Sequence, residues 1–372
     1  MKKNNKRGIT HILIPAKEEY PMTLQDKYRE ISVIWERIEK KNGKDIQKWE
    51  QINERKELED ILLQWQKQHF RQAGETPLSS KEWKLKLVDE STQQAILNGN
   101  FEMQEELPEE CQQILMFMKT NAKMRNKINH TTTFEEFQGF IKRATEKSSC
   151  SPSGRNYSHY KTLLENNRIL RIIHGIFDLA LDYNVVLNRW AQTVTTLMPK
   201  DDGPIYVHRL RAIHVVEAEL QFFSKIVYAK RMVNLAETNN EITDEQYGGR
   251  KGRRAQSVVL NKLMYYGITY QRREEAAFMD DDAKACYDRI IPSLASVEVQ
   301  KWGVSPKAAA LTRKIVEEQQ FRVKTAHGVS DNTYAYSLDD QTYGMGQGLG
   351  WSGAIWMVTS DTICKILAQE GA

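Results

Sequence analysis

The stretch "FMDDDAKACYDRI" (residues 278–290) places four aspartates within nine positions, directly after a short apolar run. Carboxylates this close repel one another, so the pattern requires a cation or free access to water. Successive side chains of a strand alternate between faces, so Asp280 and Asp282 would project together, away from Asp281. Two carboxylates on one face suit a hard divalent cation such as Mg²⁺, and an acidic turn that caps the following helix fits the pattern equally well.

The composition of the whole chain sets the class of protein. The chain has 372 residues, 40% of them hydrophobic and 27% charged, with a net charge of +4. This suits one large domain or two smaller ones with a sizeable core. There is no apolar run long enough to span a membrane and no apolar segment of a secretory signal, which predicts a soluble intracellular protein and does not distinguish nucleus from cytoplasm. The four cysteines match neither a zinc spacing nor a disulfide framework.

Helical periodicity dominates the first half of the sequence. The runs "ISVIWERIEK" and "KELEDILLQWQKQHF" within residues 24–72 are amphipathic, and the serines before Lys81 can cap a further helix. Helices are also expected over 108–124, 134–147 and 161–183. The last of these carries apolar residues at helical spacing: Leu163, Leu164, Ile169, Ile172, Ile173, Ile176 and Leu179.

The second half mixes strand and helix signals, so the fold class is predicted to be α+β. Residues 190–216 contain β-prone runs separated by "PKDDGP", which predicts a hairpin. Helical periodicity returns over 217–236 and 254–267. We expect "EEAAFMD" to form a strand that ends at the aspartates, with a helix starting near Cys286, then strands within 321–338. Finally, "GMGQGLGWSGAIW" opens as a glycine-rich loop that runs into a helix.

The segment "GGRKGRR" (248–254) is the sharpest concentration of positive charge. It holds Arg250, Lys251, Arg253 and Arg254 among three glycines, without an acidic residue. Backbone amides and cationic side chains could approach a phosphate together here. A solvated basic loop is the alternative interpretation of the same composition.

Six stretches, in order, are similar to segments of reverse transcriptases of the non-LTR, long interspersed type. "DAKACYDRI" (282–290) resembles the first catalytic motif of the palm, and "GMGQGLGWSGAIW" (344–356) resembles the second. The four stretches that resemble segments of the fingers are "SPSGRNYSHYK" (151–161), "LMPK" with "RLRAIHVV" (197–216), "SKIVYAKRM" (224–232) and "EQYGGRKGRR" (245–254). The resemblance covers roughly residues 148–372, and "LLQWQKQHFRQAGETPLSS" (62–80) resembles a phrase found between endonuclease and polymerase in such elements.

The resemblance implies a right-hand polymerase arrangement and an RNA-directed DNA polymerase activity. Fingers would occupy about 148–265 and a partial palm about 266–372, preceded by a helical N-terminal extension over residues 1–147. The partners would be an RNA template, a DNA primer and deoxynucleoside triphosphates, with no membrane involved. The reaction would be two-metal nucleotidyl transfer with Mg²⁺.

The resemblance also assigns roles to single residues. Asp282 would ligate both Mg²⁺ ions, assisted by the backbone carbonyl of Ala283. Lys200 and Arg211 would hold the triphosphate, as a point charge and a forked guanidinium. Tyr287 would fill the space under the sugar and select deoxynucleotides, and its alternative role is that of a core aromatic.

The remaining roles concern nucleic acid. Gln347 and Gly348 would approach the nascent base pair and the template–primer, where a Cβ would intrude. Arg250, Lys251, Arg253 and Arg254 would contact phosphates.

Two departures from the family pattern limit these expectations. Gly353 stands where the family has proline, and no Tyr-x-Asp-Asp motif follows the second palm motif. The chain is therefore expected to be inactive alone unless a second chain supplies the rest of the palm and the thumb. A non-catalytic nucleic-acid-binding module is the alternative. A Mg²⁺-dependent phosphohydrolase would need more carboxylates or histidines in a metal-ready arrangement, and none stands out.

Overall fold

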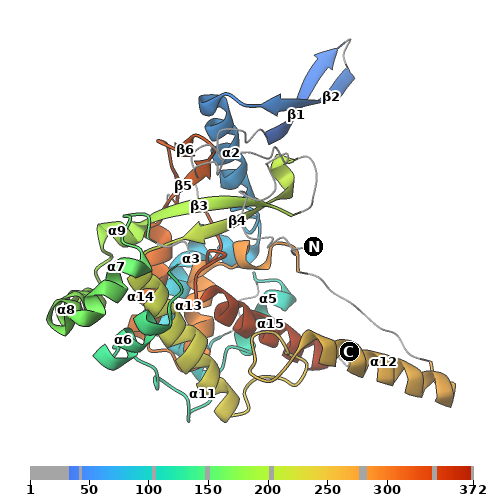
Figure 1. Cartoon of the computed structure of the whole chain (residues 1–372). Helices are drawn as coiled ribbons and strands as arrows, with labels where there is room; N and C mark the ends of the chain where they lie inside the picture. The colour runs from blue at the N-terminus through green and yellow to red at the C-terminus, as the bar shows by residue number, and fades with distance from the viewer. Residues whose placement is uncertain are drawn as a thin grey trace.

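The computed structural model of the chain describes residues 33–41, 44–102, 106–146, 151–200, 205–275, 283–336 and 342–369. Helices make up most of this part, and a mixed sheet crosses it (Figure 1). The α+β prediction is confirmed at this level. No helix in the described ranges is both long and apolar enough to cross a membrane.

The helices and strands follow one another in mixed order along the chain. The α-helices are α2 (Arg55–His69), α3 (Lys81–Val88), α4 (Glu90–Asn98), α5 (Glu109–Met116), α6 (Phe134–Arg143), α7 (Tyr157–Thr162), α8 (Asn167–Asp182), α9 (Asn188–Ala191), α10 (Ala218–Ser224), α11 (Val233–Thr238), α12 (Ala255–Arg272), α13 (Pro292–Lys301), α14 (Pro306–Glu318) and α15 (Ser352–Gln369). The strands are β1 (Val33–Lys41), β2 (Lys44–Ile52), β3 (Gln192–Pro199), β4 (Leu210–Val215), β5 (Gln320–Thr325), β6 (Gly328–Val329) and β7 (Tyr334–Ala335). A π-helical segment, Lys225–Met232, joins α10 to α11.

The first expected helix is wrong, because β1 (Val33–Lys41) and β2 (Lys44–Ile52) are paired strands. Strands β1 and β2 pair antiparallel along their whole length, and the ladder ends at Lys41 opposite Lys44. The two residues between them in the sequence are Asn42 and Gly43, the dipeptide that most favours a two-residue hairpin connection. Valine, isoleucine and tryptophan in these strands also favour the extended conformation. The extension is therefore not purely helical. Figure 1 shows the hairpin projecting from the molecule beyond α2, and its base is attached to the core because Ile52 of β2 is buried with Leu58 of α2.

The main sheet has the order β4-β3-β5-β6, with β7 paired to the other part of β5. Strands β3 and β4 form the predicted hairpin, with Pro199 opposite Leu210 and Val194 opposite Val215. Strand β5 lies parallel to β3, which is possible because α10 to α14 intervene in the chain between them. The strands expected within 321–338 are confirmed by β5, β6 and β7.

The N-terminal extension packs directly on this sheet. Leu58 and Leu62 of α2 are fully buried in one cluster with Leu197 of β3 and Val323 of β5. Phe70, which follows α2, stacks on Phe321 with ring centroids 6.3 Å apart. Residues on both sides of the predicted boundary at 147/148 thus share one core.

Two further clusters complete the interior. Helices α3, α4 and α5 surround Val297 of α13, which is fully buried. The larger cluster joins α6, α8, α10, α13, α14 and α15 around Phe222, Trp302 and Trp351. Local capping matches the sequence signals, since the Ser80 hydroxyl accepts the Trp83 N–H at the start of α3. The extension is therefore anchored at several points.

Two further predicted helices are present, and one is not. Helix α12 confirms the helix after the basic loop, and α15 confirms the helix after the glycine-rich loop. The helix expected from Cys286 is wrong: Cys286–Asp288 is one turn of 3-10 helix, and α13 begins at Pro292. Proline at the first helical position cannot donate an N–H and fits there without loss. The strand expected at "EEAAFMD" lies almost wholly outside the described residues.

Candidate nucleic-acid site

The two loops that resemble palm motifs lie against each other. The N–H of Gly344 donates to the carbonyl of Ile290 (N···O 2.8 Å), and the N–H of Met345 donates to the carbonyl of Tyr287 (3.0 Å). Gly344 has φ +97°, and a Cβ there would lie 2.9 Å from the Cα of Asp288. The close approach of these loops therefore needs a glycine at position 344.

The second loop also closes on strand β4. The N–H of His214 donates to the carbonyl of Gln347 (2.7 Å), and the side-chain amide of Gln221 donates to the carbonyl of Gly348 (2.7 Å). Gly348 has φ +116°, and a Cβ would lie 2.6 Å from the backbone oxygen of His214. The structure thus brings Gln347 and Gly348 onto the hairpin that carries Arg211.

Lys200 and Arg211 both lie on the β3–β4 hairpin, with exposed side chains. The N–H of Lys200 donates to the carbonyl of Arg209 (3.0 Å), and Arg211 pairs with Met198 in the ladder. Arg211 lies three positions before His214, where the Gln347 loop is attached, which corresponds to about 10 Å of strand. Both cations are therefore exposed on the hairpin to which this loop is bonded.

The proposed metal ligand falls outside the described residues. Asp280, Asp281 and Asp282 are not described, whereas Ala283 is described and exposed. Within the described ranges, no group of three or more histidine, cysteine, aspartate or glutamate side chains could hold a metal ion. The coordination expected of Asp282 and Ala283 stays a prediction.

Asp288, the last aspartate of the opening stretch, is buried and paired. Its Oδ2 lies 2.9 Å from Nε2 of His69, at the end of α2. Gln72 bridges this group to the neighbouring arginine, since its amide nitrogen lies 3.0 Å from Nδ1 of His69 and its oxygen accepts from Nε of Arg289 (3.0 Å). The extension therefore holds the first palm-like loop in place.

His214 forms a neutral, buried floor beneath the glycine-rich loop. Burial lowers its pKa to about 4, although the Asp288 carboxylate acts in the opposite direction. Its Nδ1 lies 3.1 Å from the Thr195 hydroxyl, which in turn lies 3.2 Å from the hydroxyl of Tyr334. The ring also packs against Phe321, with centroids 4.8 Å apart. An uncharged imidazole lets the loop sit directly on the sheet.

Tyr287 is half-buried, and its backbone carbonyl is used by the Met345 contact. Burial raises the pKa of its hydroxyl, and nearby Cys286 adds to the shift. The phenol therefore stays protonated and uncharged at neutral pH. Its proposed position under a sugar and its alternative role as a core aromatic both remain compatible with this placement.

A basic pocket that the sequence did not reveal adjoins Gly348. It has a volume of about 520 Å³. Its cationic lining comes from Arg143, Lys225 and Lys230, all exposed, and its aromatic lining from Phe140 and Tyr157. The other lining residues are Ala144, Thr145, Gln221, Ile226 and Gly348. Three positive charges around one pocket suit the phosphates of a nucleic-acid chain.

The π-helical segment explains why two of these lysines share the pocket. Residues five apart on an α-helix diverge by about 140° around the axis. In a π-helix the backbone bond runs from i to i+5, so residues five apart come close to one face. Lys225 and Lys230 are separated by five positions within Lys225–Met232. The irregular winding thus directs both ammonium groups to the pocket.

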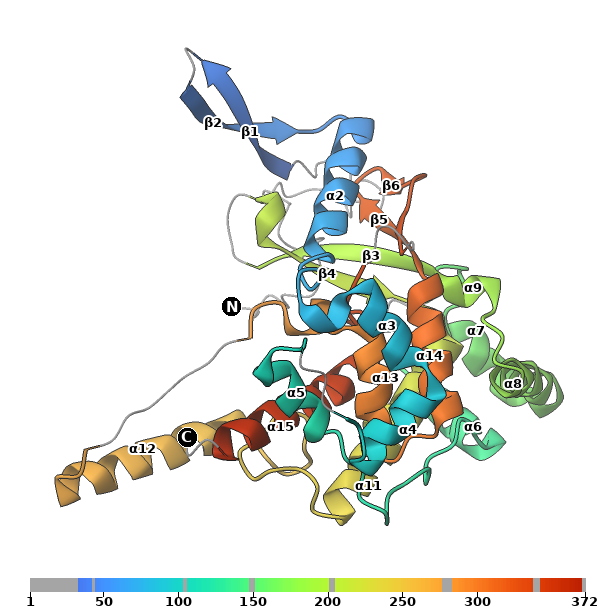
Figure 2. The ribbon, with the colours of Figure 1, turned by 180° about the vertical axis from the view of Figure 1, so that it is seen from behind.

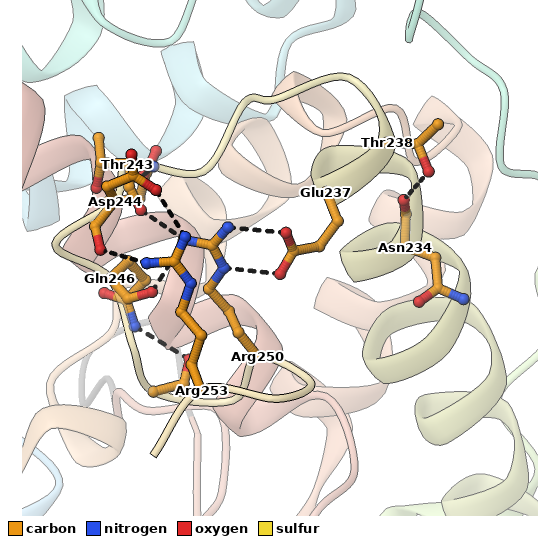
Figure 3. A network of polar contacts seen from close by, with 10 residues as sticks. Asn234, Glu237, Thr238, Thr243, Asp244, Gln246, Arg250 and Arg253 are labelled. Carbon is orange, nitrogen blue, oxygen red and sulfur yellow. Dashed lines mark hydrogen bonds and ion pairs between the residues drawn. The ribbon is translucent and has the colours of Figure 1, made fainter. Parts of the chain in front are cut away.

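The four cations of the basic loop (248–254) fall into two groups: two are paired within the protein and two are exposed. Arg250 forms a two-point ion pair with Glu237, with Nε···Oε1 at 2.7 Å and Nη2···Oε2 at 2.8 Å, and it also donates to the carbonyl of Thr243 (Figure 3). Arg253 donates to both the backbone and the carboxylate of Asp244. Lys251 and Arg254 are exposed. Two of the four predicted phosphate contacts are thus engaged within the protein.

The pocket and the His69–Asp288 contact join residues that are far apart in the sequence. Lys225 and Lys230 lie in the "SKIVYAKRM" stretch and His69 lies in the 62–80 stretch, but the resemblance assigned none of them a role. Arg143 lies in neither stretch, and His69 meets Asp288 across 219 positions of sequence. Neither a protein-family model nor a curated protein matches this chain.

Proposed function

We propose that this chain is a fingers-and-palm region of the reverse transcriptase type, which binds an RNA template with a DNA primer. The observation that carries the proposal is the meeting of three segments that resemble the family. The loop at 283–291, the loop at 342–350 and the β3–β4 hairpin are joined by backbone hydrogen bonds at Tyr287, Ile290 and His214.

The charge distribution around these loops supports nucleic acid as the ligand. Arg211 and Lys200 extend from the hairpin, and the basic pocket opens beside Gly348. Phosphates passing across this region would meet cations on both sides of the glycine-rich loop. The glycines at 346 and 348 let this loop pack closely on β4, because a Cβ there would lie 2.6 Å from the Leu349 side chain and 2.6 Å from the backbone oxygen of His214, respectively.

The catalytic part of the proposal rests on Asp282 and Ala283. Together they would hold Mg²⁺, which would stabilise the attacking and leaving oxygens of nucleotidyl transfer. Lys200 and Arg211 would position the triphosphate, and the basic pocket would position the nucleic acid. A binding module without catalysis is the second candidate, favoured by a basic pocket that needs no metal to bind phosphates.

The binding experiment measures the affinity of the chain for a fluorescent RNA–DNA template–primer at several salt concentrations. Changing Arg143, Lys225 and Lys230 together to glutamine should weaken binding and reduce the slope of log K against log salt by about 0.7–0.9 for each lost phosphate contact. Lys307→Gln is the matched control, because Lys307 is exposed on α14 and does not line the pocket. An unchanged slope in the triple variant would exclude the pocket as a nucleic-acid site.

Primer extension with Mg²⁺ separates the two candidates. Incorporation of deoxynucleotides that is lost in Asp282→Asn would establish a polymerase. Binding without incorporation would favour the binding module. Incorporation that survives in Asp282→Asn would refute the assignment of Asp282 as the metal ligand.

A further inference from the structure

Helix α8 has two apolar faces, of which only one is used within the chain. Leu170, His174, Phe177 and Leu181 are buried in the large helical core. On the opposite side, Ile169, Ile172, Ile176, Leu179 and Tyr183 are 43%, 56%, 49%, 57% and 76% exposed. Figures 1 and 2 both show α8 at the outer edge of the molecule. The exposed set is a continuous apolar stripe, which a surface helix ordinarily lacks.

The spacing of this stripe is that of a coiled-coil seam. Successive members are separated by three, four, three and four residues. This repeat averages 3.5 residues and matches alternating a and d positions of a heptad. Ile169, Ile176 and Tyr183 then occupy a positions, and Ile172 and Leu179 occupy d positions. The chemistry of the stripe therefore calls for another helix with the same repeat.

The flanking charges identify that helix and its direction. In this register Arg168 and Asp182 both occupy g positions, and their side chains are exposed. In an antiparallel pair g positions face each other, so Arg168 of each copy would meet Asp182 of the other, forming two ion pairs. In a parallel pair g faces e, where Ile173 and Ala180 offer no charge. The helix is thus complementary to itself only when antiparallel.

We propose that α8 is a dimerisation surface that pairs with α8 of a second copy in an antiparallel coiled coil. Ile169 of one copy packs against Leu179 of the other, and Ile172 packs against Ile176. Gly175 lies at the g position nearest the centre, and no atom lies within 4 Å of a Cβ built there. Its lack of a side chain lets the two backbones approach closely. The interface is isologous, as in most two-fold dimers.

The seam is short, so the dimer should be weak. It contains about two heptads, and we expect it to bury less area than the roughly 1,200–2,000 Å² of specific, stable complexes. A dissociation constant on the order of 10 μM is therefore expected. This range is accessible to sedimentation velocity with the full 372-residue chain.

The first experiment compares two exposed apolar positions by sedimentation velocity. The unaltered chain should shift from monomer to dimer as its concentration rises, and Ile176→Lys should remain monomeric. Leu263→Lys on α12 is the matched control, because Leu263 is also exposed, at 62%. It should dimerise as the unaltered chain does. A monomer at all concentrations, or a dimer that persists in Ile176→Lys, would overturn the proposal.

A charge exchange tests the direction of pairing. Arg168→Asp alone should weaken dimerisation at least tenfold, because two aspartates would face each other. Asp182→Lys alone should do the same, and its folding is checked by circular dichroism because Asp182 also contacts His130 (2.7 Å). An equimolar mixture of the two variants should recover a dimer. Failure of the mixture to recover, with both variants folded, would exclude the antiparallel arrangement.

Discussion

Arg250 and Glu237 face each other through two parallel contacts of 2.7 and 2.8 Å, thirteen positions apart in the chain. The side chain of Arg250 is only 8% exposed, and that of Glu237 is 34% exposed. The pair fastens the glycine-rich basic loop to α11. Arg250, which the sequence suggested as a phosphate contact, therefore stabilises the fold through Glu237.

We predict that Arg250→Ala destabilises the fold by about 2 kcal/mol, because it removes two charge-assisted hydrogen bonds and leaves Glu237 without its partner. Arg250→Lys should recover only part of this loss, since an ammonium group cannot form the two-point contact. Urea denaturation followed by circular dichroism measures both. Equal stability of Arg250→Ala and the unaltered chain would contradict this interpretation.

Lys251→Ala and Arg254→Ala are the matched controls for Arg250. Both side chains are exposed, so each change should alter the free energy of unfolding by less than about 0.5 kcal/mol. If the loop contacts phosphates, these two variants and not Arg250→Ala report it through a reduced salt slope.

A pair of glycines in one segment should respond in opposite directions to alanine. At Gly348 the new Cβ would lie 2.6 Å from the His214 oxygen, in a backbone conformation with φ +116°. Gly348→Ala should therefore cost about 2–3 kcal/mol of stability. Gly353 lies in the first turn of α15, where a Cβ meets nothing within 4 Å. Gly353→Ala should stabilise the fold by about 0.5–1 kcal/mol.

Thermal unfolding measures both variants: the unfolding temperature should fall in Gly348→Ala and rise in Gly353→Ala, relative to the unaltered chain. An equal shift in both would mean that the tight contact between the 342–350 loop and β4 does not form in solution.

The buried carboxyl of Glu298 should make stability fall with rising pH. Burial raises its pKa to about 7, against the Thr359 hydroxyl and Lys301, which lower it. The folded state therefore holds this proton more tightly than the unfolded chain, whose value is 4.5. The free energy of unfolding should decrease between pH 4.5 and pH 7, by about 3 kcal/mol at most.

Burial lowers the pKa of Lys301 to about 8, so the folded state releases that proton before the unfolded chain does. Its contribution to stability rises only above pH 8. The two groups together place the lowest stability near pH 7–8. Denaturant unfolding at pH 5 and pH 7.5 should show the fall in the unaltered chain and a smaller fall in Glu298→Gln. Glu318→Gln is the control: Glu318 is exposed, so this change should leave the fall in the free energy of unfolding between pH 5 and pH 7.5 as large as in the unaltered chain.

Local signals in the sequence predicted much of the secondary structure. The turn residues after Pro199 indicated the β3–β4 hairpin, and apolar spacing indicated α2, α8 and α12. The hairpin at 33–52 was misassigned because its charged and apolar residues also fit a helical period. The Asn42-Gly43 dipeptide was the signal that could have corrected it.

The candidate site was less predictable, because its contacts are non-local. Sequence motifs indicated the two loops, and the structure places them together through Tyr287 and Met345. Charge alone could not reveal that Arg250 has Glu237 as its partner, or that His69 holds Asp288. Periodicity also could not distinguish the buried face of α8 from its exposed one, since both are apolar.

The π-helical segment Lys225–Met232 joins α10 to α11, so its winding decides in which direction the side chains of α11 point. One residue removed between Lys225 and Met232 would turn the downstream part by about 100°. Lys230 would then leave the pocket, and Glu237 would swing away from Arg250 at the same time. The π-helical winding therefore couples the position of the ammonium groups in the pocket to the anchorage of the basic loop, and an insertion or deletion in this segment would disturb both.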